Sequence, residues 1–130
     1  MLVLDYAWDL ENLYADGIMG MSPTVQESGA ELVLEEMHRQ GVIDNQLFSI
    51  QVGDYNEPSY ITIGGYNVSR YAKEELQWHN LTNDMYWTIG MDSVAVGGEE
   101  LDIRTRDIIV DSGTSYLLMP TSNQHRIHTL

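Results

Sequence analysis

The residues best suited to chemistry lie together at residues 108–115, which read IIVDSGTS. Three β-branched apolar residues predict a buried strand, and Gly113 beyond it permits a sharp turn that brings backbone N–H groups against a neighbouring oxygen. Asp111 therefore stands at a strand end among N–H and hydroxyl donors, which compensate the burial of a carboxylate and keep it ionised. An ordinary Asp-Ser-Gly turn at a strand end explains the same residues equally well.

Other catalytic and metal-binding patterns fail on spacing. His125 and His128 stand three residues apart, but no third ligand lies at a suitable spacing, so no metal or cofactor is expected. A nucleophilic serine needs a Gly-x-Ser-x-Gly elbow, and Leu117 occupies the position of the second glycine after Ser115. The chain contains no cysteine, which excludes thiol catalysis.

A mostly β chain with short helices is expected to position these residues. Leu32, Val33 and Met37 recur at helical spacing and Gly41 follows as a stop, so residues 30–40 are the best helix candidate. Strands are predicted at 47–52, 60–63, 86–91, 93–96 and 107–110, with a hairpin loop at 53–58 and turns at the glycine pairs 64–65 and 97–98. A second helix is expected after Pro120, with Thr121 or Ser122 as its N-cap.

Residues 108–115 resemble the second Asp-Ser/Thr-Gly motif of the pepsin-like aspartic proteases, and other segments resemble that family in the same order. Residues 16–21 (DGIMGM) are similar to the segment that closes the active-site loop of the first lobe. Residues 32–50 resemble the helix, turn and strand that follow it. The remaining matches are 61–65 (ITIGG) near the lobe junction, 76–78 (LQW) and 86–89 (YWTI) as opening strands of the second lobe, and 94–98 (VAVGG) as a hairpin.

The resemblance implies part of a pepsin-like bilobal acid-protease fold, with parts of two β-barrel-like lobes. Residues 1–72 would form the C-terminal part of the first lobe, and residues 73–130 the N-terminal part of the second lobe, which carries the Asp motif. The family uses two catalytic aspartates, one from each lobe, whereas this sequence holds one such motif. We therefore expect an internal fragment of a longer protein. Neither part is expected to be stable alone, since each has only about 55 to 70 residues and no disulfide.

The function implied by the resemblance is that of an aspartic endopeptidase. Two close carboxylates share one proton and activate a water against a peptide bond. The partners are a peptide or protein substrate and the missing remainder of the bilobal chain. The isolated 130-residue chain is expected to be inactive. A catalytically inactive peptide-binding or structural module is the alternative.

The resemblance also assigns roles around the catalytic carboxylate. Asp111 would be one of the two catalytic aspartates. Ser112 would join the hydrogen-bond network beneath the pair, while Gly113 would donate its N–H and Thr114 its hydroxyl to the Asp111 carboxylate.

Further positions are expected to contact substrate or carry sugar. Ser115 would face the substrate backbone, and Ile18 and Tyr86 would be pocket walls on the two sides of the scissile bond, or equally plain core residues. Asn67 and Asn80 begin Asn-x-Ser/Thr sequons, which makes them glycosylation candidates.

The net charge of the chain argues against two classes of binding partner. The formal net charge of −14 argues against nucleic acid, whose phosphates require Lys and Arg, and disfavours an anionic membrane. No run reaches transmembrane length, and the apolar start at residues 1–4 meets Asp5 at once, so no signal peptide is expected in this segment. The family resemblance implies a secreted protein or one in the lysosomal or vacuolar lumen.

Overall fold

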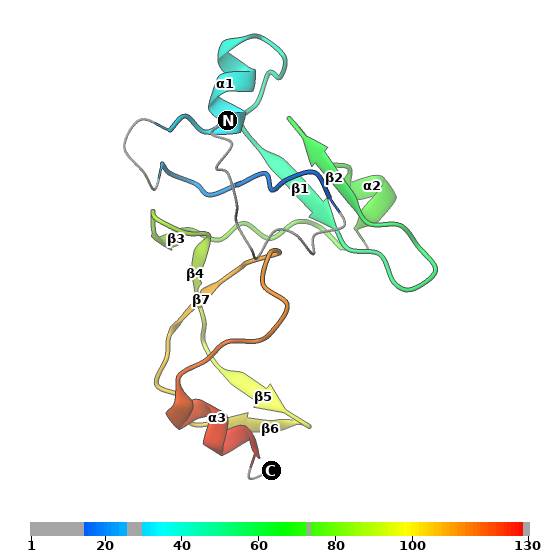
Figure 1. Cartoon of the computed structure of the whole chain (residues 1–130). Helices are drawn as coiled ribbons and strands as arrows, with labels where there is room; N and C mark the ends of the chain where they lie inside the picture. The colour runs from blue at the N-terminus through cyan, green and yellow to red at the C-terminus, as the bar shows by residue number, and fades with distance from the viewer. Residues whose placement is uncertain (1–14, 26–29, 73, 129–130) are drawn as a thin grey trace.

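The computed structural model describes residues 15–25, 30–72 and 74–128. These residues form short strands and short helices, shown in Figure 1. In chain order the elements are α1 (Val33–Arg39), β1 (Phe48–Gln51), β2 (Tyr60–Ile63), α2 (Val68–Tyr71), β3 (Leu81–Asn83), β4 (Thr88–Gly90), β5 (Val94–Val96), β6 (Glu99–Leu101), β7 (Asp107–Ile109) and α3 (Thr121–His128). The predicted mostly β chain with short helices is confirmed.

Helix α1 ends where the glycine stop was predicted. Gly41 adopts a φ of 70°, a conformation that residues with a Cβ rarely take. Its N–H donates to the His38 carbonyl and the Val42 N–H donates to the Met37 carbonyl, both at 2.9 Å, which satisfies carbonyls of the last turn. The apolar residues of the helix are only partly buried, and α1 contains no fully buried residue.

Strands β1 and β2 form an antiparallel hairpin in which Phe48 pairs with Ile63 and Gln51 pairs with Tyr60. The predicted strand at 60–63 and the predicted loop at 53–58 are confirmed. Within the loop, the Asn56 N–H donates to Asp54 Oδ1 at 2.8 Å, the turn geometry that aspartate favours.

Strands β3, β4 and β7 form a three-stranded sheet in that order, with both pairs antiparallel. The side chains of Thr82 and Asp107, from the two outer strands, meet in a hydrogen bond of 2.8 Å. Gly90 lies on the central strand β4, where it pairs with Asp107 of β7. A Cβ placed on Gly90 would lie 4.0 Å from Thr82 Cγ2. A Cβ at this distance would make an ordinary van der Waals contact. The Thr82–Asp107 bond joins β3 to β7, the strand that leads to Asp111.

The lower part of the molecule in Figure 1 holds the β5–β6 hairpin and α3. Gly97 and Gly98 have φ values of 61° and 90° and form the predicted two-residue turn. Helix α3 is confirmed, but it begins at Thr121. Thr121 and Ser122 therefore lie inside its first turn, and the predicted N-cap at either residue is wrong.

Strand predictions differ from the structure in three further places. Residues 76–78 were expected to form a strand, but they lie in an irregular segment that precedes β3. Strands β3 and β6 were not predicted, because their sequences LTN and EEL lack the apolar alternation that marks a strand.

The buried core is small. Among the described residues, Ile103 is the one buried hydrophobic side chain, and Thr88 and Asn123 are buried polar ones. The accessible surface is 11763 Å², whereas a compact monomer of this mass exposes about 7000 Å². The apolar run of β7 was predicted to be buried, and this is wrong: Ile108 and Ile109 are 43% and 53% exposed, because the described residues provide no layer of protein over β7.

Among the described residues, hydrogen bonds and ring contacts join the part before position 72 to the part after it, and one of them is the edge-on contact of the Tyr66 and Trp78 rings, with centroids 6.1 Å apart. The Trp87 indole N–H donates to the Met21 carbonyl at 2.6 Å, and the Trp87 ring meets Phe48 edge-on with centroids 5.7 Å apart. Nearby, the Thr24 hydroxyl donates to the Asp84 carbonyl at 2.9 Å. Trp87 thus connects the β3–β4 turn to both β1 and the segment at 15–25.

Candidate active site

Asp111 lies one residue beyond the end of β7, after Val110, and both of its carboxylate oxygens accept a hydrogen bond from the next turn. The Gly113 N–H donates to Oδ1 at 2.8 Å, and the Thr114 hydroxyl donates to Oδ2 at 2.5 Å. The upstream residue Val110 is held in place because its N–H donates to the Trp87 carbonyl at 2.9 Å. The β7 ladder therefore fixes the backbone before the carboxylate, and the turn fixes the carboxylate itself.

These donors act on the protonation of the carboxyl group. The Thr114 hydroxyl first, and the Gly113 N–H second, hold the pKa of Asp111 below its ordinary value of 3.8, while slight burial acts in the opposite direction. A donor lowers a carboxyl pKa because it stabilises the charged form. The ionised form of Asp111 therefore persists to lower pH than that of an aspartate without these donors.

Gly113 brings its backbone close to the carboxylate. A Cβ built on this residue would lie 3.3 Å from Asp111 Oδ1, tighter than most real contacts of this kind. A side chain at position 113 would therefore crowd the carboxylate that accepts the Gly113 N–H bond, and glycine avoids this.

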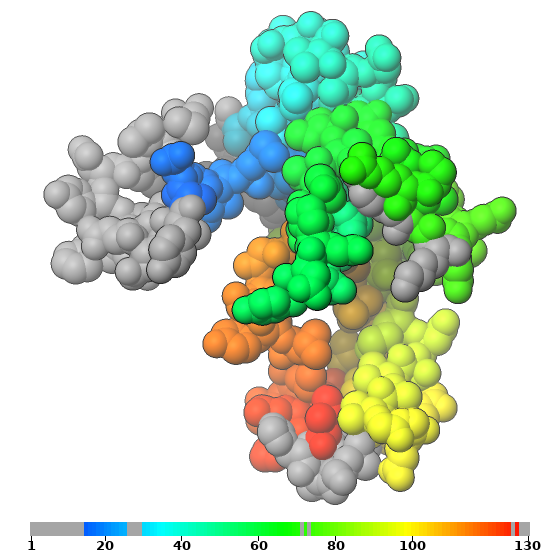
Figure 2. Space-filling model, turned by 90° about the vertical axis from the view of Figure 1, so that its right-hand side faces the viewer, coloured from blue at the N-terminus to red at the C-terminus, as the bar shows by residue number. Residues whose placement is uncertain are grey.

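The surroundings of the carboxylate differ from the expectation in one respect. Asp111 was expected to be a buried carboxylate compensated by donors, but it is exposed, like all residues from 106 to 122. Figure 2 shows the segment after β7, in orange, at the surface of the molecule. The donors arise from the local turn, whereas burial requires a further layer of protein over β7, which the described residues do not provide.

The structure brings Asp111, Gly113 and Thr114 together but leaves the other expected site residues separate from them. Among the described residues, the Ser112 and Ser115 hydroxyls have no hydrogen-bond partner. Ile18 is 74% exposed and Tyr86 is 47% exposed, so neither forms a closed pocket wall in this chain.

Trp87 has a positioning role that the sequence reading missed. It holds Val110 through its carbonyl and the segment at 15–25 through its indole N–H. The available signal was the residue type, since a tryptophan N–H that lies near the core usually has an acceptor.

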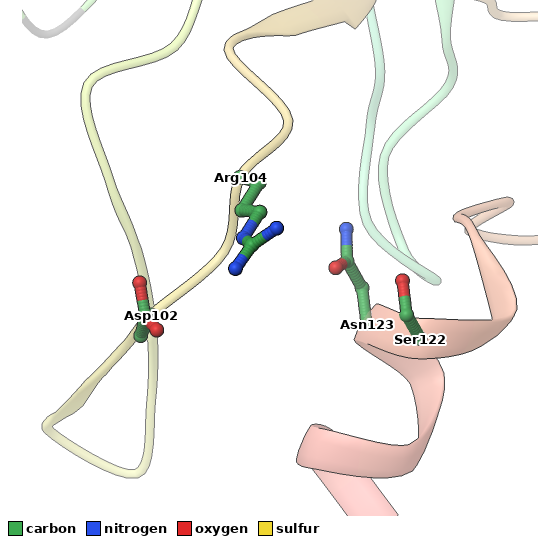
Figure 3. Close-up of a pocket in the computed structure, with 4 residues that line it drawn as sticks. All are labelled: Asp102, Arg104, Ser122 and Asn123. Atoms are coloured by element: carbon green, nitrogen blue, oxygen red, sulfur yellow. The ribbon is translucent and has the colours of Figure 1, made fainter.

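A second group of polar side chains lies apart from the Asp111 turn. Asp102, Arg104, Ser122 and Asn123 line a small open pocket. In Figure 3, Arg104 reaches into this space from the β6–β7 connection, and Ser122 and Asn123 reach into it from α3. The Asn123 amide donates to the Thr105 hydroxyl at 3.0 Å, which ties α3 to the segment before β7. The residues that line the pocket therefore have a structural role, which is to hold α3 in place.

Within residues 15–25, 30–72 and 74–128, no three acidic or histidine side chains gather where they could bind a metal ion. In the same part of the chain, no helix has the length and apolar character that crossing a membrane requires.

Comparisons with known proteins agree with the resemblance carried by residues 108–115. The profile of the family described as eukaryotic aspartyl protease matches residues 6–129. The chain is 36% identical over 115 residues to pepsin A of Gallus gallus, covering 86% of this chain and 31% of that protein. It is 35% identical over 109 residues to pepsin II-2/3 of Oryctolagus cuniculus, covering 82% of this chain and 28% of that protein. It is 34% identical over 109 residues to pepsin A of Bos taurus, covering 82% of this chain and 29% of that protein. The chain thus spans less than a third of the length of these relatives.

Proposed function

Because the chain belongs to the eukaryotic aspartyl protease family, we propose that it carries one half of the catalytic site of an aspartic endopeptidase, with Asp111 as the catalytic carboxylate. The observation that carries this proposal is the pair of hydrogen bonds that the Gly113 N–H and the Thr114 hydroxyl donate to the two oxygens of Asp111. This turn orients an ionised carboxylate at the end of a strand.

The second carboxylate is proposed to come from a part of the protein outside these 130 residues, since no other Asp-Ser/Thr-Gly occurs here. Two carboxylates held close together share one proton and titrate as a pair. The ionised member takes a proton from a water between them as the water oxygen attacks the scissile carbonyl carbon, while the protonated member gives its proton to the carbonyl oxygen. Collapse of the resulting diol breaks the C–N bond, and the amine nitrogen takes up a proton as it leaves.

The supporting residues take proposed roles around this chemistry. Gly113 and Thr114 keep Asp111 ionised and oriented, and Ser112 has a free hydroxyl for a network that forms with the second carboxylate. Ser115 is proposed to face the substrate backbone. Ile18 and Tyr86 are proposed pocket walls, in keeping with their exposure.

The two parts of the chain are proposed to belong to two lobes, residues 1–72 to the first and 73–130 to the second. The contacts of Trp87 with Met21 and Phe48 then lie between lobes. A peptide or protein is the proposed substrate. The protein is proposed to be secreted or to lie in the lysosomal or vacuolar lumen. We propose no nucleic-acid or membrane partner, because the net charge of −14 repels phosphates.

The test begins with the messenger RNA of the parent gene. An in-frame Asp-Thr/Ser-Gly upstream of residue 1 is expected, and its replacement by another residue would favour the inactive peptide-binding module. In parallel, the 130-residue chain is assayed for peptide cleavage at mildly acidic pH, with and without pepstatin. No turnover is expected. Pepstatin-sensitive turnover that Asp111→Ala abolishes would contradict the claim that the second carboxylate lies elsewhere.

A further inference from the structure

Helix α2 begins at the sequon Asn67-Val68-Ser69, and the side chains of this sequon form one hydrogen-bonded turn. Asn67 is the N-cap residue, and its Oδ1 accepts from the Arg70 N–H at 3.1 Å. The same oxygen accepts from the Ser69 hydroxyl at 2.9 Å. The cap therefore uses the carbonyl oxygen of the Asn67 amide and leaves its nitrogen out of both bonds.

The nitrogen of Asn67 is accessible. Asn67 and Ser69 are exposed, and among the described residues Nδ2 of Asn67 has no hydrogen-bond acceptor. An N-linked sugar is attached through this nitrogen, and the carbonyl oxygen of the amide still accepts hydrogen bonds afterwards. A glycan and the helix cap are thus compatible on one side chain.

The second sequon differs in how its hydroxyl is bound. Asn80 is also exposed, but the hydroxyl of Thr82 donates to Asp107 Oδ1 at 2.8 Å, and Leu81 is paired with Ile89 in the β3–β4 ladder. The Thr82 side chain is thus bonded to β7 and the Leu81 backbone is paired with β4, whereas the side chains of the first sequon bond only within the α2 turn.

We propose that Asn67 carries an N-linked glycan that leaves the cap of α2 intact. In this group transfer the oligosaccharide comes from a lipid pyrophosphate donor. A bond forms between Nδ2 and C1 of the first sugar, the bond from C1 to the pyrophosphate oxygen breaks, the electron pair leaves with the pyrophosphate, and Nδ2 loses one proton. The proposal rests on the lumenal route given under the proposed function, and on no catalytic property of Asp111.

The experiment uses the whole 130-residue chain behind a secretion signal in eukaryotic cells, with a C-terminal tag that carries an independent sequon. Asn80→Gln is present throughout, so that Asn67 begins the remaining sequon of the chain. Only molecules whose tag is glycosylated are counted, which separates lumenal entry from occupancy at Asn67. Occupancy is measured by mass spectrometry, as the conversion of Asn67 to aspartate by peptide-N-glycosidase.

We expect at least half of the counted molecules to be glycosylated at Asn67, and Ser69→Thr to keep this occupancy. Ser69→Ala is expected to remove the glycan. Asn67→Asp is the matched control, because aspartate caps a helix as well as asparagine but cannot accept the sugar. Exchange of the Arg70 amide hydrogen should be equally slow in the glycosylated chain and in Asn67→Asp, and faster in Asn67→Ala. Counted molecules without sugar at Asn67, or a glycosylated chain with the fast exchange of Asn67→Ala, would overturn the proposal.

Discussion

The Thr114 hydroxyl donates to Asp111 Oδ2 at 2.5 Å across three residues of chain. This contact and the Gly113 N–H bond to Oδ1 form within one turn, so they need no residue from elsewhere in the fold. The orientation of the catalytic carboxylate is therefore a local property. Its burial and its pairing with a second carboxylate are not local, and they depend on protein that lies over β7.

The first prediction concerns the protonation of Asp111. Thr114→Val removes the hydroxyl that contributes most to the low pKa of this carboxyl, so the pKa should rise toward 3.8. It is measured by NMR titration of the Asp111 carboxyl carbon. Ser112→Ala is the matched control, because the Ser112 hydroxyl makes no bond to the carboxylate, and it should leave the titration unchanged. An unchanged pKa in Thr114→Val would contradict the assigned role.

The same donors make stability depend on pH. The folded pKa of Asp111 lies below the unfolded value, so this group stabilises the fold above the unfolded pKa, and the contribution is lost as the pH falls through the folded pKa. Unfolding of Thr114→Val and of the parent chain should therefore differ near neutral pH and converge at strongly acidic pH. A difference that grows on acidification would have the wrong sign.

The third prediction concerns the glycine next to the carboxylate, and it uses a chimera in which this chain replaces the aligned segment of Gallus gallus pepsin A. Gly113→Ala places a Cβ 3.3 Å from Asp111 Oδ1, which displaces the carboxylate by a few tenths of an ångström. We expect kcat to fall by about 10-fold, given that a full ångström of misplacement costs about 100-fold. Gly65→Ala is the control, because no atom lies within 4 Å of its Cβ. Equal kcat values in the two variants would contradict the steric argument.

The fourth prediction concerns Trp87. Trp87→Phe keeps an aromatic ring beside Phe48 but removes the N–H that donates to the Met21 carbonyl, so it should lower the free energy of unfolding of the chimera by about 1 kcal/mol. Trp78→Phe is the matched control: Trp78 is 77% exposed, Phe keeps an aromatic ring beside Tyr66, and among the described residues the Trp78 indole N–H has no acceptor, so a change below about 0.5 kcal/mol is expected. Urea titration measures both variants. A loss in Trp87→Phe no larger than that in Trp78→Phe would contradict the role assigned to the Trp87 hydrogen bond.

Sequence patterns predicted the elements that are determined by residues close together in the chain. The strand at 60–63, the Gly41 stop and the Gly97–Gly98 turn all follow from residues within a few positions of each other. Strands β3 and β6 escaped prediction because their pairing rests on backbone hydrogen bonds to neighbours and not on an apolar alternation.

The candidate site shows the same difference between local contacts, which were predicted, and distant contacts, which were not. Asp111, Gly113 and Thr114 are joined as expected because they lie within one turn. The burial of Ile108 and Ile109 was wrong, and the roles of Ile18 and Tyr86 stay predictions, because both depend on what packs against them from distant parts of the protein. The apolar pattern at 108–110 indicates that these residues suit a protein core. It does not indicate which segment covers them.

The most direct measurement of the central claim is the acid endopeptidase activity of the chimera with Asp111 replaced by Asn. The chimera is expected to cleave peptides, and Asp111→Asn should abolish turnover while circular dichroism shows an unchanged fold. Asp92→Asn, an exposed aspartate in the same part of the chain, should leave turnover unchanged. Peptide cleavage by the Asp111→Asn chimera at the parent rate would contradict the assignment of Asp111 as a catalytic carboxylate.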